Sequence, residues 1–208
     1  MKKAATLLLL ILPFACYSQD YAGVIAGVGF SNMKGDDIAP GVSISNKITV
    51  NLGIKTELQF SEHWFLMCGI EYCGKGYKAK DATHTNNVTL SYIQLPFSAL
   101  YKLPLDKDAN NQLLFGAGPY VGFGIGYKSV WTEEDPVMGH EEGIESADFA
   151  DMGMRITDFG FTALAGIQVG KRVQVFASYQ PGLVNVFYSA DFGLVKNRRA
   201  GLQLLYVF

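Results

Sequence analysis

Apolar and polar residues alternate with a period of two along most of the chain after residue 20. This is the side-chain period of a β-strand, because successive side chains of a strand point to opposite faces. Eight segments follow it, and no segment has a convincing helical period. They are Tyr21–Phe30, Val50–Phe60, Trp64–Tyr77, Val88–Lys102, Gln112–Tyr127, Asp158–Val169, Arg172–Val186 and Asn197–Phe208. The pattern predicts an all-β chain of eight strands.

Each predicted strand has one apolar face and one face that is polar or rich in glycine. Two kinds of barrel share this pattern. A soluble barrel of the lipocalin kind carries its apolar face inside, whereas a transmembrane barrel turns that face to the lipid. The polar face here has few charges, aromatic residues fall near the strand ends, and the chain ends on Phe208 after an alternating strand. These features favour the transmembrane barrel.

The predicted connections alternate in length. Four are long, Ser31–Thr49, Lys78–Asn87, Lys128–Thr157 and Ser189–Lys196, and three are shorter, Ser61–His63, Leu103–Asn111 and Gly170–Lys171. Bacterial outer-membrane barrels have short periplasmic turns and longer outer loops, and closure pairs every backbone group as lipid requires. We therefore predict an eight-stranded, antiparallel, up-and-down transmembrane β-barrel in the outer membrane, with both termini periplasmic.

The first 18 residues have the composition of a secretory signal peptide. Lys2 and Lys3 precede the apolar stretch Ala4–Ala15, which is too short to span a bilayer as a helix. We expect cleavage after Ser18, leaving residues 19–208 as the barrel domain. Acylation at Cys16 is the alternative, and Pro13-Phe14-Ala15 in front of it makes a poor lipoprotein signal.

Charge and cysteine content exclude several classes of function. The formal net charge of −2 comes with no basic patch, so nucleic acid is not an expected partner. Cys68 and Cys73 lie five residues apart on one predicted strand, hence on opposite faces, and cannot form a disulfide. No metal-ligand spacing or catalytic motif is present. We expect no enzyme activity, cofactor or metal; an outer-rim enzyme using His84 or His140 is a weaker alternative.

Several charged residues fall on the polar face and are expected to point into the barrel. They are Lys55, Glu57, Glu71, Lys75, Arg172 and Arg199. Because a buried charge is costly unless it is paired, we expect ion pairs among them that fill the lumen. The alternative is a narrow, charge-lined conducting path, although eight strands enclose only enough space for side chains.

The predicted loop Lys128–Thr157 is strongly acidic. It includes Glu133, Glu134, Asp135, Glu141 and Glu142, together with Glu145, Asp148 and Asp151. Its spacing matches no EF-hand loop, so a solvated outer loop is favoured over a divalent-cation site. A loop of this length is the expected contact surface for a partner outside the cell.

Several motifs resemble small outer-membrane β-barrel proteins of Bacteroidetes. The opening strand reads AGVIAGVGFSNMKG (22–35), and YIQLP (92–96), DFGF (158–161), YQPGLVNV (179–186) and KNRR (196–199) follow. Gln180-Pro181 departs slightly from the family pattern. The resemblance implies a barrel in the outer membrane and supplies no catalytic residues. One branch of the family is similar to the PorT-like barrel component associated with type IX secretion, and others are loosely called porins.

We therefore expect a structural or interaction role, with contacts made through long outer loops, mainly 128–157. A docking component of a secretion or envelope machine and a small porin-like pore are the alternatives. The expected partners are outer-membrane lipid and lipopolysaccharide, the barrel-assembly machinery through Phe208, and envelope or secretion proteins.

Overall fold

The computed structural model describes residues 21–34, 42–81, 83–135, 139–188 and 194–208, which form ten strands. The strands are β1 (Tyr21–Lys34), β2 (Ser43–Ser45), β3 (Lys47–Gln59), β4 (Trp64–Lys80), β5 (His84–Pro104), β6 (Gln112–Asp135), β7 (Gly139–Ala147), β8 (Thr157–Val169), β9 (Val173–Pro181) and β10 (Lys196–Val207). The predicted signal peptide lies outside the described residues. No helix in these described ranges is long and apolar enough to cross a membrane.

Eight of the strands close into a ring. The antiparallel order is β1-β3-β4-β5-β6-β8-β9-β10, and β10 pairs with β1 from Gly23↔Val207 to Lys34↔Lys196. The two remaining strands are additions at one end, since β2 pairs with β4 and β7 pairs with β6. The prediction of an eight-stranded, up-and-down antiparallel barrel is confirmed.

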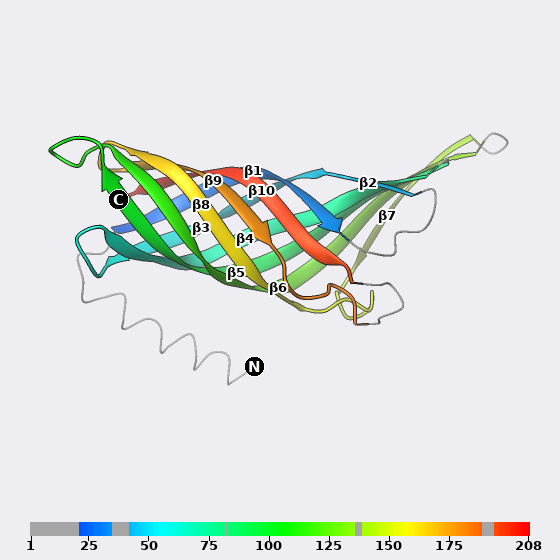
Figure 1. Cartoon of the computed structure of the whole chain (residues 1–208). Helices are drawn as coiled ribbons and strands as arrows, with labels where there is room; N and C mark the ends of the chain where they lie inside the picture. Colours follow the sequence, from blue (N-terminus) through cyan, green and yellow to red (C-terminus); the bar gives the residue numbers. More distant parts are fainter. Residues whose placement is uncertain (1–20, 35–41, 82, 136–138, 189–193) are drawn as a thin grey trace.

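The two ends of the barrel differ (Figure 1). One end, here called the turn end, carries the short connections 60–63, 105–111 and 170–172 and the last residue, Phe208. At the opposite end, the loop end, β4, β5, β6 and β7 rise on one side well beyond the other ring strands. One wall of the barrel is therefore much taller than the rest.

The apolar face of the strands points outward, as predicted. Leu52, Ile54 and Leu202 expose about 60% of their surface, whereas their chain neighbours Asn51 and Gln203 are buried. Outward apolar residues surround the barrel, and polar and apolar residues both fill its inside. A surface of this kind is matched to hydrocarbon rather than to water.

The strands extend further at the loop end than the alternation predicted. The predicted loop 78–87 shrinks to residues 81–83, and part of the predicted loop 31–49 is strand, including β2. The largest correction concerns 128–157, where β6 continues to Asp135 and pairs with β7 as a hairpin. Backbone pairing holds these polar segments as strands where side-chain alternation gave little indication.

A β-bulge in β6 changes which side chains point inward near the loop end. Tyr92 of β5 pairs with Gly124 and Ser91 pairs with Gly126, which leaves Ile125 as an extra residue. Beyond it, Tyr127 and Ser129 are buried while Lys128 is exposed. An added residue reverses the two faces of a strand, so aromatic Tyr127 faces the interior instead of the lipid.

Candidate functional site

The barrel interior holds the charged residues that the sequence placed on the polar face. The following five are almost completely buried there: Lys55, Glu57, Glu71, Lys75 and Arg199. Arg172 is different, because it lies in the turn between β8 and β9, is exposed, and donates a hydrogen bond to the Tyr206 hydroxyl at 3.2 Å. The expectation that Arg172 points inward was therefore wrong, since strand pairing begins only at Val173.

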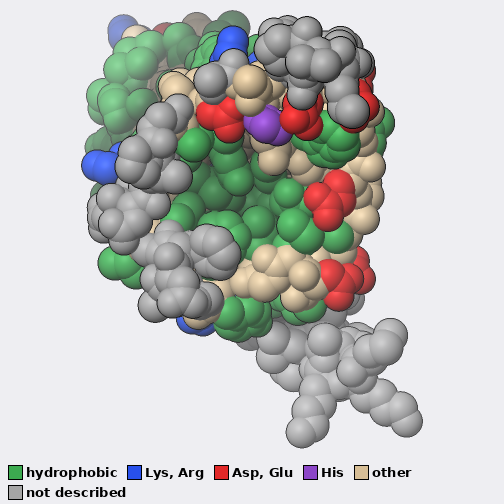
Figure 2. Space-filling view, turned by 90° about the vertical axis from the view of Figure 1, so that its right-hand side faces the viewer, with side chains coloured by type: hydrophobic (Ala, Val, Ile, Leu, Met, Phe, Trp, Pro, Cys, Tyr) green, Lys and Arg blue, Asp and Glu red, His purple; other side chains and the backbone are tan. Residues whose placement is uncertain are grey.

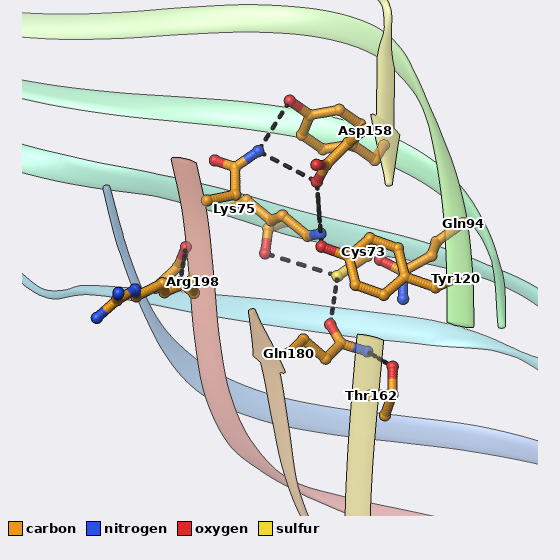
Figure 3. Close-up of polar contacts among 12 residues, drawn as sticks. Cys73, Lys75, Gln94, Tyr120, Asp158, Thr162, Gln180 and Arg198 are labelled. Carbon is orange, nitrogen blue, oxygen red and sulfur yellow. Dashed lines mark hydrogen bonds and ion pairs between the residues drawn. The ribbon is translucent and has the colours of Figure 1, made fainter. Parts of the chain in front are cut away.

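The central ion pair joins Lys75 of β4 to Asp158 of β8 (Figure 3). Lys75 Nζ lies 2.8 Å from Asp158 Oδ2, and both side chains are buried. Asn197 donates to the same oxygen at 3.2 Å, and the lysine ammonium lies 4.1 Å from the centre of the Tyr120 ring. Charge pairing and a cation–π contact together compensate for the loss of water around the ammonium.

A neighbouring polar contact in the same view involves Cys73 (Figure 3). Its Sγ lies 4.0 Å from Gln180 Oε1, and Gln180 Nε2 donates to Thr162 Oγ1 at 3.3 Å. Cys73 is buried inside the barrel and Cys68 faces away from it, so no disulfide joins them. A buried thiol of this kind contributes to packing rather than to redox chemistry.

A second network crosses β3, β4 and β10. Lys55 Nζ lies 3.8 Å from Glu71 Oε2, and Asn51 donates to the same carboxylate oxygen at 3.4 Å. Arg199 donates to Asn51 Oδ1 at 2.7 Å and to Thr49 Oγ1 at 3.3 Å. Hydrogen bonds therefore link one cation to an ion pair on the next strands, which fixes the relative positions of these side chains.

The third ion pair lies near the turn end. Lys102 Nζ contacts Glu57 Oε2 at 2.5 Å and Gln168 Oε1 at 3.4 Å. A cavity of about 500 Å³ opens beside this pair, lined by Glu57, Lys102, Gln168 and Gln174 among others. Water can therefore approach this pair more closely than the central one.

An apolar belt separates these polar networks. Its residues are Ile25, Phe65, Met67, Leu100, Leu114, Leu164, Phe176, Leu205 and Val207. Along β5 the inward residues run from Lys102 through Leu100 to Gln94, which places the belt between the turn-end pair and the central networks. Side chains therefore pack across the lumen at this level, as expected for eight strands.

A second apolar cluster, the mouth cluster, fills the loop end of the barrel. It contains Met33, Val88, Leu90, Tyr92, Tyr127, Phe149, Met154 and Val186. The Phe149 ring meets Tyr92 edge-on at 5.2 Å and packs so closely on Gly124 that a side chain there would collide with it. Figure 2 shows the loop end hollowed, with hydrophobic side chains inside the hollow and acidic ones along its upper and right-hand edge.

The acidic residues predicted for a loop lie on the hairpin instead. Glu141 and Glu142 of β7 are exposed, and Glu133 of β6 is half-buried with its carboxylate 3.1 Å from His84 Nε2. Glu134 and Asp135 belong to β6, but their side chains lie outside the described part. Within the described residues, no group of three or more His, Cys, Asp or Glu is arranged to hold a metal ion.

Two functional partners were missed at the level of sequence, Lys102 and Asp158. Each has the same parity as the polar face of its strand, so alternation does place it inward. What alternation cannot supply is the pairing across the barrel, because Lys75 and Asp158 are 83 residues apart. Strand order and register bring them together.

A closed ring of antiparallel strands with a lipid-matched outer face and a packed interior defines a transmembrane β-barrel. The sequence profile of the family described as "outer membrane protein beta-barrel domain" matches residues 18–188. The chain belongs to this family and is an outer-membrane protein.

The chain is similar to several solved structures at low sequence identity. Neisserial surface protein A is 14% identical, with 90% of this chain and 97% of that chain covered and a TM-score of 0.47. The attachment invasion locus protein Ail of Yersinia pestis is 13% identical, with 90% and 98% covered and a TM-score of 0.46. OprG of Pseudomonas aeruginosa is 13% identical, with 91% and 94% covered and a TM-score of 0.40. A search of curated proteins gave no match.

Proposed function

We propose that this outer-membrane barrel is a non-enzymatic interaction protein that contacts a partner through the β6–β7 hairpin. In the proposed orientation the turn end and both termini face the periplasm, and the loop end faces the outside of the cell. The observation that carries the proposal is the hairpin itself, which rises beyond the ring at the loop end (Figure 1). Short turns on the periplasmic side are the rule for barrels of this class.

The hairpin has the features of a protein-binding edge. Among the described strands, β7 pairs with β6 alone, which leaves its other edge without a strand partner. Ile144 in the middle of β7 is 69% exposed, and Glu141 and Glu145 beside it are also exposed. An extended segment can add to such an edge by backbone hydrogen bonds. The acidic side chains favour a basic segment.

The C-terminal residue supports a second proposed contact, with the barrel-assembly machinery. Phe208 is 71% exposed at the turn end, and its backbone N–H donates to the Ala22 carbonyl at 2.9 Å. The strand that closes the barrel therefore presents an exposed aromatic side chain, whose ring meets Tyr206 edge-on at 6.1 Å. Deletion of Phe208 is expected to lower the amount of heat-modifiable barrel in the membrane fraction, and an unchanged amount would remove this contact from the proposal.

Docking within a secretion or envelope machine remains an alternative form of the same role. A conducting pore is supported less, because ion pairs and the apolar belt pack across the lumen. We expect negligible conductance after refolding into planar bilayers. Steady openings that disappear in Glu71→Gln would favour the pore instead.

The hairpin contact can be tested by photo-crosslinking in intact cells. A photoreactive residue at Ile144 should give an adduct with a basic protein, and the same residue at Leu202, on the lipid face, should not. Neutralising the hairpin by Glu133→Gln, Glu141→Gln, Glu142→Gln and Glu145→Gln should remove the adduct while the barrel still assembles. If the adduct forms equally in the neutralised variant, recognition is not by the acidic hairpin.

A further inference from the structure

Three lysines outside the lumen gather on the outer surface of the barrel, at the base of the hairpin. They are Lys47 of β3, Lys78 of β4 and Lys128 of β6, here called the rim lysines. Lys78 and Lys128 are exposed, and their neighbours Tyr77 and Tyr127 pack inward against the mouth cluster. Both lysines therefore point away from the lumen. The bulge at Ile125 is what turns Lys128 outward.

Lys47 reaches the same surface by crossing β4. Its Nζ donates to Asn87 Oδ1 at 2.6 Å and to Thr89 Oγ1 at 2.5 Å, and both of these residues belong to β5. The side chains of Asn87 and Thr89 point outward, because Val88 and Leu90 are buried in the mouth cluster. Glycines 74 and 76 occupy the outward positions of β4 between the two strands, so no side chain blocks the path.

The three rim lysines surround one outward patch of β5 and have no acidic partner among the described residues. Lys78 pairs with Asn87 across β4 and β5, and Lys128 pairs with Thr89 across β5 and β6, so both lysines flank the two residues that bind Lys47 Nζ. In the described part of the chain, no carboxylate lies within 4 Å of any rim lysine, although every buried lysine has one. Like charges held together repel each other, and an anion that binds between them relieves the repulsion. Two of the three N–H donors of Lys47 are used, which leaves one for such an anion.

The position of the rim lysines relative to the lipid face indicates which anion. The outward apolar band ends immediately below them, at Ile48 of β3 and Ile125 of β6, which are 68% and 54% exposed. Polar groups that begin where the apolar band ends lie at the level of lipid headgroups. Clustered lysines at that level attract anionic headgroups, and lysine binds phosphate as a point charge.

We propose that Lys47, Lys78 and Lys128, with Asn87 and Thr89, bind the phosphorylated headgroup of an outer-leaflet glycolipid, the lipid A part of lipopolysaccharide. The assignment to the outer leaflet rests on the orientation given under the proposed function. The site holds the lipid against the β3–β6 wall, directly under the hairpin. Since the three lysines make no ion pair with the described residues of the ring, we expect the ring to assemble without them.

The test uses folded, detergent-solubilised protein and purified lipid A, with bound lipid counted by native mass spectrometry. The variant Lys47→Gln/Lys78→Gln/Lys128→Gln should bind bisphosphorylated lipid A on the order of a hundredfold more weakly, at roughly fivefold per lysine. A matched control, Lys107→Gln/Lys171→Gln/Arg172→Gln, removes the same charge from the turn end and should bind like the original protein. Replacement of the rim lysines by arginine should retain binding.

Three results would overturn the proposal. One is equal retention of lipid A by the glutamine variant, and another is an equal loss in the turn-end control, which would indicate only net charge. The third concerns the source of the phosphate. Dephosphorylated lipid A should bind poorly, and inorganic phosphate in large excess should not displace the lipid; full displacement would make this a free-phosphate site.

The orientation is tested separately, so the two failures can be told apart. Glu141 of β7 is exposed and pairs with Glu133, five residues beyond Lys128, so a lipid at the rim lysines does not cover it. Glu141→Cys should react with a membrane-impermeant maleimide in intact cells, whereas Lys107→Cys at the turn end should not. The reverse labelling pattern would overturn the orientation and the outer-leaflet assignment while leaving the lipid A affinity measured in detergent unchanged. A glutamine variant that fails to bind selectively would overturn the site alone.

Discussion

Lysines in the lumen and lysines at the loop-end rim have opposite charge environments. Inside the barrel, Lys55, Lys75 and Lys102 each have a carboxylate within 4 Å. At the rim, Lys47, Lys78 and Lys128 have none in the described ranges, and Lys47 donates to the neutral side chains of Asn87 and Thr89. Burial makes a partner obligatory, because an unpaired buried ammonium costs several kcal/mol. An exposed lysine has no such requirement, so a lysine cluster at the rim can exist without contributing to the stability of the fold.

The largest effect is expected from breaking the central pair. Asp158→Ala leaves Lys75 buried without its carboxylate and should reduce the free energy of unfolding by about 3–5 kcal/mol. Urea unfolding of the barrel in lipid vesicles measures this. Asp148→Ala, at an exposed position, is the control and should stay within about 0.5 kcal/mol of the original protein.

The same pair can be replaced as a unit. Lys75→Met combined with Asp158→Leu removes both charges and should recover most of the stability lost by Asp158→Ala, because matched apolar groups avoid the desolvation cost. A double variant that is as unstable as the single one would mean that the hydrogen bonds of Asn197 and Tyr120, rather than the charge pair, hold this layer together.

A smaller loss is expected at the turn-end pair. Glu57→Gln removes the charge partner of Lys102, but the adjacent cavity of about 500 Å³ gives the ammonium access to water. The cost should be about 1–3 kcal/mol, less than at the central pair. If the same unfolding measurement ranks the two pairs the other way round, water access is not what separates them.

At the rim the expected change in stability is smaller still. Lys47→Gln should alter the free energy of unfolding by less than about 1 kcal/mol, as is usual for an exposed polar contact. Its Nζ donates to two side-chain oxygens and to no carboxylate. A loss as large as that of Asp158→Ala would show that Lys47 contributes to the stability of the barrel as much as the buried lysines do.

The smallest effect concerns pH at the β4–β5 turn, outside the membrane. The backbone N–H groups of His84 and Thr83 donate to Asp81 and hold the pKa of its carboxyl below the ordinary value of 3.8. Because the pKa is lower in the folded protein, this contribution is complete above pH 3.8 and is lost as the pH falls through the lowered value. The protection of the Thr83 and His84 amides against hydrogen exchange, measured by NMR, should fall only below pH 3.8. A loss of protection already at pH 5 would contradict the assignment.

A feature of this barrel could be predicted from the sequence when residues close along the chain determine it, and could not when residues far apart along the chain determine it. Strand faces are decided locally, so alternation placed Lys55, Glu71 and Lys75 on the inward side without knowledge of the fold. Partners across the ring are decided by strand order and register, so Asp158 could be assigned to a face but not to Lys75. The inward turn of Tyr127 depends on a single added residue at Ile125, which no periodic pattern announces.

The hairpin was missed for a different reason. Its strands are paired to each other through the backbone, and their side chains are largely acidic or exposed rather than alternately buried. A search for strands with one buried face cannot detect a two-stranded ribbon whose side chains are mostly exposed. Sequence reasoning located the right segment and its charge, but assigned it the wrong backbone structure.

The uneven height of the barrel wall determines how far from the membrane surface a bound partner is held. The nine residues of β7 amount to about 30 Å of extended chain, comparable to the thickness of a hydrocarbon core. In the proposed orientation, a partner bound at the far end of β7, near Gly139, would be kept at a distance from the bilayer on the β5–β6 side, whereas Ile144 pairs with Val130 and lies about 7 Å beyond Lys128. On the side of β9 and β10, where the strands end lower, the same partner would meet the surface with no such spacer. Shortening the hairpin by whole residue pairs would therefore change reach without changing the ring.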